Sequence, residues 1–251
     1  MKKRVSILFS MALGVALLCS TANAQGYVLS QAMECDWSQI EKADEIAEQI
    51  FAPLLDQQLR QGSLQAWAYW GQYVGGDYAR LGILVAEDPA SLVKGFDNYR
   101  AALFGNAGTA EAAAAFLSIC QGHRDTIWKI QAASAPVGDI AGMEDMYNHS
   151  GYYTCDLSRA DRLAEIIEAI TPALNKGVSY GFVGTWMWGS RVRGGPENYV
   201  ISYRGPSHAS LLEGIDKLQT IVWEQYPDEA RDFTTICRTS ESYMWNVLMM
   251  N

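Results

Sequence analysis

Apolar positions in the first half of the chain change their spacing several times, and each change predicts a new element. Alternating or aromatic-rich runs, which are typical of strands, cover residues 27–35, 64–73, 78–86 and 126–132. Between them, apolar residues recur at helical spacing after a capping box at Ser38 and Glu41, from Pro89 to Leu103, and over 109–119. The order of these elements predicts a βαββαβ unit.

The same pattern returns later in the chain, which indicates a tandem duplication. Offsets of 117 to 120 residues pair rare residue types: Cys35 with Cys155, Pro53 with Pro172, Trp67 with Trp186, Cys120 with Cys237, and Trp128 with Trp245. So many ordered matches are hard to obtain by chance. We therefore predict a first α+β repeat over residues 25–132, a linker over 133–146 and a second α+β repeat over 147–251.

The first 24 residues have the three parts of a secretory signal peptide. They comprise a basic start of Lys2, Lys3 and Arg4, an apolar stretch from Ile7 to Leu18, and the small-residue cleavage motif Ala22-Asn23-Ala24. We expect cleavage after Ala24 and a periplasmic or secreted mature protein. No later segment reaches the ~20 apolar residues of a spanning helix, so the sequence predicts no membrane span.

The acidic charge balance excludes some classes of partner. The formal net charge is −9, and loss of the three basic leader residues moves it to −12. Nucleic acids and anionic lipids favour surfaces with clustered Lys and Arg, so neither is an expected partner. Apolar residues make up 49% of the chain, which favours a packed core over disorder.

Four cysteines remain once Cys19 leaves with the leader, and they occupy matching places in the two repeats. Each repeat has one near the end of its first strand and one just before its last strand. In a βαββαβ fold these strands are antiparallel neighbours, which brings Cys35 to Cys120 and Cys155 to Cys237. An oxidising compartment favours disulfides there over free buried thiols. No metal site is expected, because no CxxC motif or nearby histidine pair supplies zinc ligands.

One series of residues is shared with a known superfamily. It comprises Pro53-Leu54-Leu55, Gly62, Trp67 and Ala90-Ser91-Leu92, and in the second repeat Pro172, Gly181, Trp186 and Ala209-Ser210-Leu211. This series resembles the dimeric α+β barrel superfamily, especially NIPSNAP-like and antibiotic-biosynthesis-monooxygenase-like sequences. The resemblance implies two ferredoxin-like units packed as an intramolecular pseudo-dimeric α+β barrel. The superfamily includes cofactor-free monooxygenases, haem-dependent enzymes and proteins with no known activity, so the fold does not define a reaction.

The sequence carries no motif of a known catalytic machinery. It lacks a G-x-S-x-G elbow, a P-loop, an H-E-x-x-H motif and a Rossmann fingerprint. The histidines are His123 in a predicted polar loop, His149 near the start of a strand, and His208 at the start of a helix. His208 could face a cavity as a base or haem ligand, but a lone histidine at a helix start more often contacts solvent.

The aromatic hairpins are the remaining candidates for a ligand site. Because strand side chains alternate, Trp186 and Trp188 share one face of the second hairpin, and Arg191 and Arg193 share the other. The first hairpin has mostly uncharged residues at the matching positions, so we place any pocket chemistry in the second repeat. The candidate ligand-binding residues are Trp186, Trp188, Arg191, Arg193, Tyr203 and His208. The alternative is that the tryptophans are ordinary core and the arginines lie in water.

Three function classes follow, in order of preference. The first is an exported protein that binds a small hydrophobic or aromatic molecule in a barrel pocket, with no cofactor. The second is an enzyme of the kind the resemblance implies, either a cofactor-free oxygenase or a haem-dependent enzyme. The third is a protein-interaction module that uses sheet edges and exposed helices. The sequence decides neither whether the chain is an enzyme nor whether it forms oligomers beyond the pseudo-dimer.

Overall fold

The computed structural model describes residues 26–136, here called the first half, and 146–251, the second half. The predicted signal peptide (residues 1–24) and most of the predicted linker (133–146) lie outside these ranges. The first half contains β1 (Gly26–Glu34), η1 (Trp37–Gln39), α1 (Ile40–Ile46), η2 (Ala47–Phe51), α2 (Ala52–Arg60), β2 (Ala66–Val74), β3 (Arg80–Ala86), α3 (Pro89–Phe104), α4 (Ala107–Ile119) and β4 (Gly122–Ala133). The second half contains β5 (Tyr147–Cys155), η3 (Leu157–Arg159), α5 (Ala160–Ser179), β6 (Thr185–Gly194), β7 (Tyr199–Gly205), α6 (His208–Gln225), α7 (Pro227–Ile236) and β8 (Cys237–Met250).

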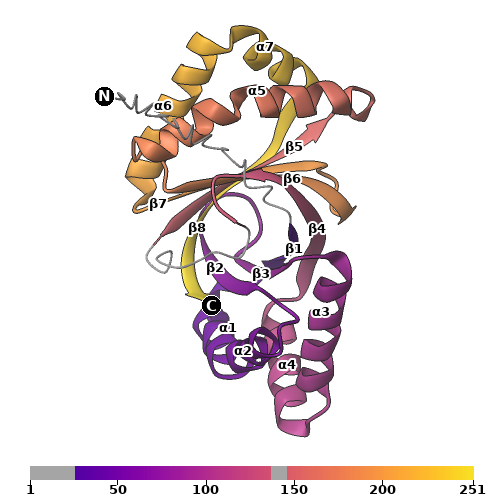
Figure 1. Cartoon of the computed structure of the whole chain (residues 1–251). Coiled ribbons are helices and arrows are strands. Elements are labelled where there is room, and N and C mark those ends of the chain that lie inside the picture. The colour runs from indigo at the N-terminus through magenta and orange to yellow at the C-terminus, as the bar shows by residue number, and fades with distance from the viewer. Residues whose placement is uncertain (1–25, 137–145) are drawn as a thin grey trace, which may run out of the picture.

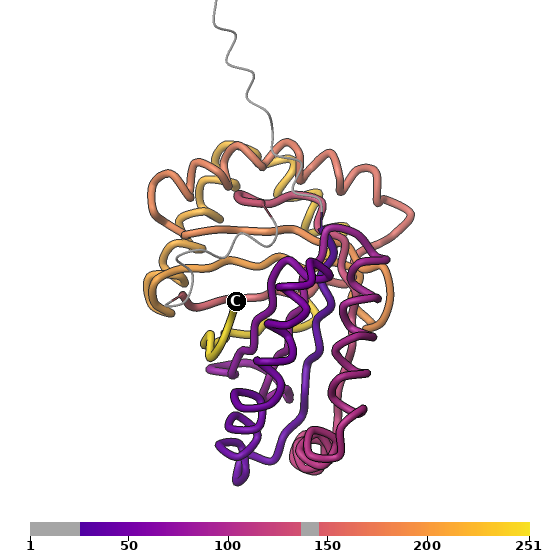
Figure 2. Tube along the Cα trace, turned by 60° about the horizontal axis from the view of Figure 1, so that its bottom comes forward, coloured from indigo at the N-terminus to yellow at the C-terminus, as the bar shows by residue number. Residues whose placement is uncertain are grey.

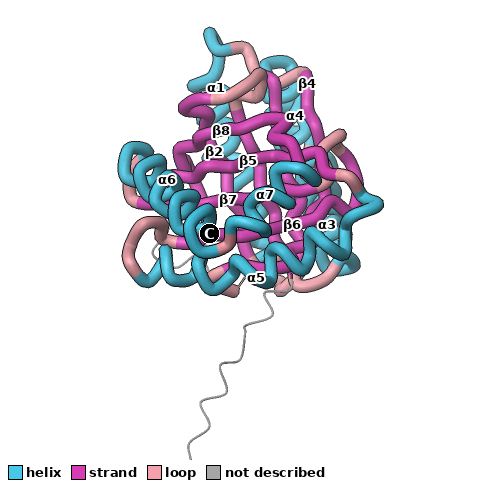
Figure 3. The backbone as a smooth tube through the Cα atoms, turned by 90° about the horizontal axis from the view of Figure 1, so that it is seen from above, coloured by secondary structure: helices cyan, strands magenta, loops and turns pink. Residues whose placement is uncertain are grey.

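The strands of both halves close one antiparallel barrel in the order β1-β3-β2-β8-β5-β7-β6-β4. The halves meet where β2 pairs with β8 and where β4 pairs with β6. Helices α1 to α4 cover the outer face of the first half, and α5 to α7 cover that of the second (Figure 1). The two helical layers lie on opposite sides of the barrel in the turned view of Figure 2, and Figure 3 shows α5 to α7 lying across the strands.

The predicted order of helices and strands is found in the described chain, with three differences in detail. Asp36, rather than the predicted capping box at Ser38, caps the first helical turn, where its carboxylate accepts from the Ser38 backbone N–H. His123 lies on β4 and not in a loop, because that strand begins at Gly122. The last strand includes Cys237, which the prediction placed just before it, because the strand pairs with both β5 and β2 across the junction of the halves.

Both predicted disulfides are present. Cys35 is bonded to Cys120 and Cys155 to Cys237, with sequence separations of 85 and 82 residues. Each bond ties the end of the first strand of its half to the start of the last strand.

Alternation along the strands divides the buried side chains into an interior layer and two outer layers. The barrel interior holds residues such as Val28, Trp70 and Trp245, while Trp67 and Trp186 face the helices of their own halves. Within the described ranges, we find no helix with the length and apolar character needed to span a bilayer.

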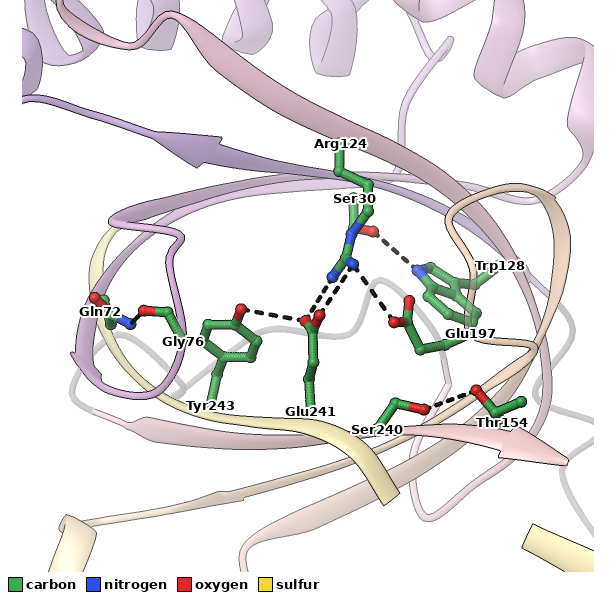
Figure 4. A network of polar contacts seen from close by, with 10 residues as sticks. All are labelled: Ser30, Gln72, Gly76, Arg124, Trp128, Thr154, Glu197, Ser240, Glu241 and Tyr243. Carbon is green, nitrogen blue, oxygen red and sulfur yellow. Dashed lines mark hydrogen bonds and ion pairs between the residues drawn. The ribbon is translucent and has the colours of Figure 1, made fainter. Parts of the chain in front are cut away.

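An ionic network joins the two halves inside the barrel (Figure 4). Arg124 on β4 contacts Glu241 on β8 at 2.8 Å and Glu197 beside β7 at 3.4 Å. Tyr243 donates to Glu241 at 3.2 Å, and Tyr78 lies under the Arg124 guanidinium at 4.8 Å. Arg124 and Glu241 occupy matching positions in the two halves. Because their charges are opposite, they form an ion pair that attracts one half to the other.

Candidate functional site

A cavity of about 360 Å³ lies between the outer face of the first half's sheet and the helices that cover it. Its walls are mostly aromatic and apolar, and they include Phe51, Trp67, Leu84, Phe96, Leu103 and Phe116. Small-molecule sites typically enclose roughly 300–1,000 Å³ with such a lining. The cavity therefore has the size and surface of a site for a small apolar ligand.

The floor of this cavity is one row of residues across four strands. The row consists of Asp125, Gln31, Gly82 and Tyr69, on β4, β1, β3 and β2. A Cβ atom at Gly82 would meet Gln31 Cβ and Met33 Cε at 3.8 Å, which is ordinary contact distance, so the site has room for a side chain. The corresponding row of the second half consists of Ser242, Gly151, Ile201 and Trp188. There the buried side chain of Ile201 fills the space that Gly82 leaves open.

The helical wall shows the same difference between the halves. Ala47 lines the cavity, and the residue 119 positions later, Ile166, is fully buried in the second half's core. Ala47 opens a π-helical segment, η2, between α1 and α2, whereas α5 runs unbroken over the corresponding stretch. Such π segments widen a helix locally and are frequent at functional sites. The cavity therefore depends on two small residues and a helix irregularity that the second half lacks.

Polar side chains border the cavity where it opens to solvent. His123 Nε2 lies 3.7 Å from Asp125 Oδ2, and Gln31 Nε2 donates to Asp125 Oδ1 at 3.2 Å. The His123 and Asp125 side chains are 52% and 41% exposed although both line the cavity, and exposed Arg100 borders it from α3. An imidazole held beside a carboxylate can exchange a proton with a bound molecule, and a guanidinium can bind its anionic group.

The second half carries none of these polar groups at the matching positions. Ser240, Ser242 and Gly151 replace His123, Asp125 and Gln31, and Gln219 replaces Arg100. Charged side chains and open volume therefore occur together in the first half, whereas the second half has uncharged residues at the matching mouth positions and buried isoleucines at those of Gly82 and Ala47. That coincidence favours a ligand site over a packing defect.

A second polar group lies deeper in the first half and is satisfied internally. The Arg80 guanidinium donates twice to the Asp44 carboxylate, each time at 2.7 Å, and the Tyr69 hydroxyl donates to Asp44 at 3.1 Å. Burial, and then the nearby Asp44 charge, raise the pKa of Tyr69, and burial alone raises the pKa of Tyr99. Both phenols therefore stay protonated, and Tyr99 lines the cavity as a neutral group.

The structure does not bring the six predicted ligand-binding residues together. Trp186, Trp188 and Tyr203 lie under the helices of the second half, where the Trp186 indole donates to Asn175 at 3.0 Å and Trp188 stacks on Tyr199. Burial raises the pKa of Tyr203.

The other three candidates lie near the ends of strands. Arg191 donates to the Gly195 carbonyl and Arg193 is exposed. His208 stacks on Tyr73 at 4.0 Å and shares a 2.9 Å hydrogen bond with Asn246. The cavity described above lies in the first half, whereas the sequence-based hypothesis placed a pocket in the second.

The predicted ligand site did not include His123 and Asp125 at the cavity mouth, because neither residue stands out in the sequence. His123 and Asp125 are two positions apart, which places them on one face of a strand, but the predicted strand began only at Thr126. A predicted strand that began at Gly122 would have placed His123 and Asp125 side by side on one face and so indicated this pair. Gly82 gives no such signal, because a glycine within a strand has several structural explanations.

Haem, which the resemblance leaves open, requires an axial donor within an apolar cavity. His123 lies at the opening with its Nε2 toward Asp125, and Cys120 is bonded to Cys35. Among the described residues that line this cavity, His123 at the opening is the one imidazole, and the one cysteine, Cys120, is in a disulfide. The described lining therefore places its imidazole at the half-exposed mouth, and not within the apolar part of the cavity where a histidine-ligated haem would need it.

Comparison with known proteins reveals the fold. No protein-family model and no curated protein matches the sequence. Among solved structures, a candidate monooxygenase from Fusobacterium nucleatum aligns with a TM-score of 0.63 at 11% identity, covering 91% of this chain and 94% of that chain. An anthrone oxidase-like protein aligns with a TM-score of 0.59 at 13% identity (92% and 94% covered), and a haem-binding protein from Thermus thermophilus with 0.52 at 10% (90% and 92%). At these identities the likeness shows the fold alone, an antiparallel eight-stranded barrel with helices over its outer face.

Proposed function

We propose that this dimeric α+β barrel protein binds a small, largely apolar molecule in the cavity of its first half. The observation that carries the proposal is the open row at Gly82, beneath an aromatic wall of suitable size. Removing apolar ligand surface from water supplies roughly 25 cal/mol per Å², which makes such a cavity a favourable place for an aromatic body.

The ligand's polar end would lie at the cavity mouth. Asp125 accepts from Gln31 and lies beside His123, while Arg100 borders the same opening. Buried polar groups of a ligand cost binding energy unless they are paired, so the polar mouth fixes which end of the molecule enters first. An aromatic molecule with one anionic or hydrogen-bonding substituent fits this arrangement.

An aromatic sulfonate, 1-anilinonaphthalene-8-sulfonate, is a suitable probe. Wild-type protein should bind it saturably, and Ala47→Ile should weaken binding by about tenfold, because the added carbons occupy the cavity as Ile166 does in the second half. Fluorescence titration measures the affinity. Glu48→Ile adds the same side chain to an exposed position of the same segment and should leave the affinity unchanged. Equal affinities for all three proteins would reject this cavity as the site.

Cofactor-free oxygenation is a second candidate, favoured by the His123–Asp125 pair at the cavity mouth. His123 would take a proton from the bound molecule and Asp125 would stabilise the imidazolium. With anthrone as the probe substrate, oxygen uptake by His123→Gln should fall about a hundredfold, the usual contribution of a general base. The affinity for the aromatic sulfonate should stay within about threefold, because the glutamine keeps the mouth polar. Uptake that His123→Gln leaves unchanged would reject the base.

Two features of the organisation are part of the same proposal. We infer that the barrel is a pseudo-dimer of two ferredoxin-like repeats, supported by the matching strand orders β4-β1-β3-β2 and β8-β5-β7-β6. We also infer export after cleavage at Ala24, supported by the leader pattern and the two disulfides. The intact mass of protein from its own cells tests the cleavage site.

A further inference from the structure

Tyr99 brings a hydroxyl group to the cavity wall of the first half, and the protein does not pair it. The residue lines the cavity from α3 and is only 9% exposed. Within the part of the chain that the structure describes, its hydroxyl has no hydrogen bond and no nearby charge, and burial alone raises its pKa. A buried polar group without a partner is rare and calls for an explanation, such as a ligand that pairs with it.

The Tyr99 hydroxyl borders open space and is not enclosed by packed side chains. Among the described residues, the side-chain polar atoms that are both sealed from water and unpaired lie in Trp70, His149, His208 and Trp245. Tyr99 shares the buried face of α3 with Leu92 and Leu103, and this helix packs on β3. The open space on that side of the helix is the cavity that Tyr99 lines, so the hydroxyl is available to a bound molecule.

Packing alone does not require a tyrosine at this position. The residue 119 positions later is Leu218, which is fully buried under the helices of the second half. In the first half the ring of Tyr99 lies 6.3 Å from that of Phe51, edge-on, and 6.5 Å from that of Phe96, stacked. These neighbours hold the ring in place. The hydroxyl therefore occurs in the half that has the cavity, on a ring whose position is fixed.

The chemistry of the wall indicates which group of a ligand would pair with Tyr99. A second phenol, Tyr69, also lines the cavity, but its hydroxyl already donates to Asp44 at 3.1 Å. The aromatic neighbours Phe51 and Phe96 offer no hydrogen-bond acceptor. A ligand hydroxyl would bring a further proton that needs an acceptor, and a carboxylate would lose its hydration beside a neutral phenol. A carbonyl oxygen needs only the proton that Tyr99 can donate.

We propose that Tyr99 donates a hydrogen bond to a carbonyl oxygen of the bound molecule, so that the cavity of the first half selects aromatic carbonyl compounds. This inference rests on the function proposed above and adds the chemical class of the ligand to it. The aromatic body would lie against the apolar wall, with a ketone or quinone oxygen at Tyr99. A site with such a donor discriminates against an analogue that lacks the oxygen, because the donor is then left unpaired.

Two naphthalenes of the same shape test this hydrogen bond. 2-Acetylnaphthalene has a carbonyl oxygen where 2-isopropenylnaphthalene has a CH₂ group, and displacement of 1-anilinonaphthalene-8-sulfonate from the folded protein gives the affinity of each. Tyr99→Phe removes the hydroxyl and keeps the ring. The ratio of ketone affinity to alkene affinity should therefore fall about tenfold in this variant, while the alkene affinity itself stays unchanged.

The control makes the same substitution outside the cavity lining. Tyr27 on β1 packs against the first half's core, so Tyr27→Phe should keep the wild-type ratio. If thermal melting shows that Tyr99→Phe does not fold, Tyr99→Leu copies the second half and allows the same comparison.

The possible failures are distinguishable. An unchanged ratio in folded Tyr99→Phe, or an equal fall in Tyr27→Phe, would overturn the role of Tyr99 and leave the ligand cavity in place. If neither naphthalene displaces the sulfonate from the wild-type protein, the ligand cavity itself is rejected, and this inference with it.

Discussion

Gly82→Ile should reduce the affinity for an aromatic ligand in the first half about a hundredfold while leaving the protein at least as stable. The new side chain reproduces Ile201 of the second half and occupies the floor of the cavity. Four added carbons in an apolar pocket exclude ligand atoms, and even one misfitted methylene changes binding about tenfold or more. Isoleucine also favours the extended backbone of a strand, so the melting temperature should hold or rise.

The control for this variant lies on the same strand. Leu81 faces the barrel interior, so Leu81→Ile alters β3 without entering the cavity and should leave the affinity for the aromatic sulfonate unchanged. Fluorescence titration and thermal melting of both variants make the comparison. A Gly82→Ile protein that melts normally and binds like wild type would show that the ligand does not lie over β3.

Removing the two disulfides one at a time should separate stability from ligand binding. The loops they close differ by only three residues, so each double Cys→Ser variant should lose about 4–5 kcal/mol of unfolding free energy by the chain-entropy model. Only Cys120 lines the cavity, at the end of α4, which its bond to Cys35 ties to β1. Loss of the Cys35–Cys120 bond should weaken aromatic sulfonate binding at least tenfold, because the end of α4 that forms part of the cavity wall is no longer held against β1.

The pair Cys155→Ser/Cys237→Ser is the matched control for the pair Cys35→Ser/Cys120→Ser. Urea unfolding gives the stability of both proteins, and affinities are compared where both are folded. Equal losses of affinity would mean that global stability, and not the wall at Cys120, governs binding.

The fold could be predicted from the sequence because its signals are local or repeated. Strand alternation, the helix start at Pro89 and the paired Trp and Cys residues each fix a piece of the topology without knowledge of the rest. The disulfide pairing followed from the same topology, since the two cysteines of each half end and precede neighbouring strands.

The site could not be predicted because its defining feature is missing volume. A cavity arises from Gly82 and Ala47 only when the register places them under the same helices, and that register is a tertiary property. The search for charge pointed instead to Arg191 and His208, whose side chains are engaged by Gly195 and Asn246. The informative contrast between the halves was the loss of side chains in the first, and not the gain of charges in the second.

Native mass spectrometry of the protein extracted from its own cells, beside the same protein carrying Gly82→Ile, tests the central claim most directly. We predict a reproducible added mass of one small molecule per chain in the wild type and its absence in the variant. A bare chain in both proteins would contradict a tightly held ligand, and the same added mass in both would place the ligand outside the cavity of the first half.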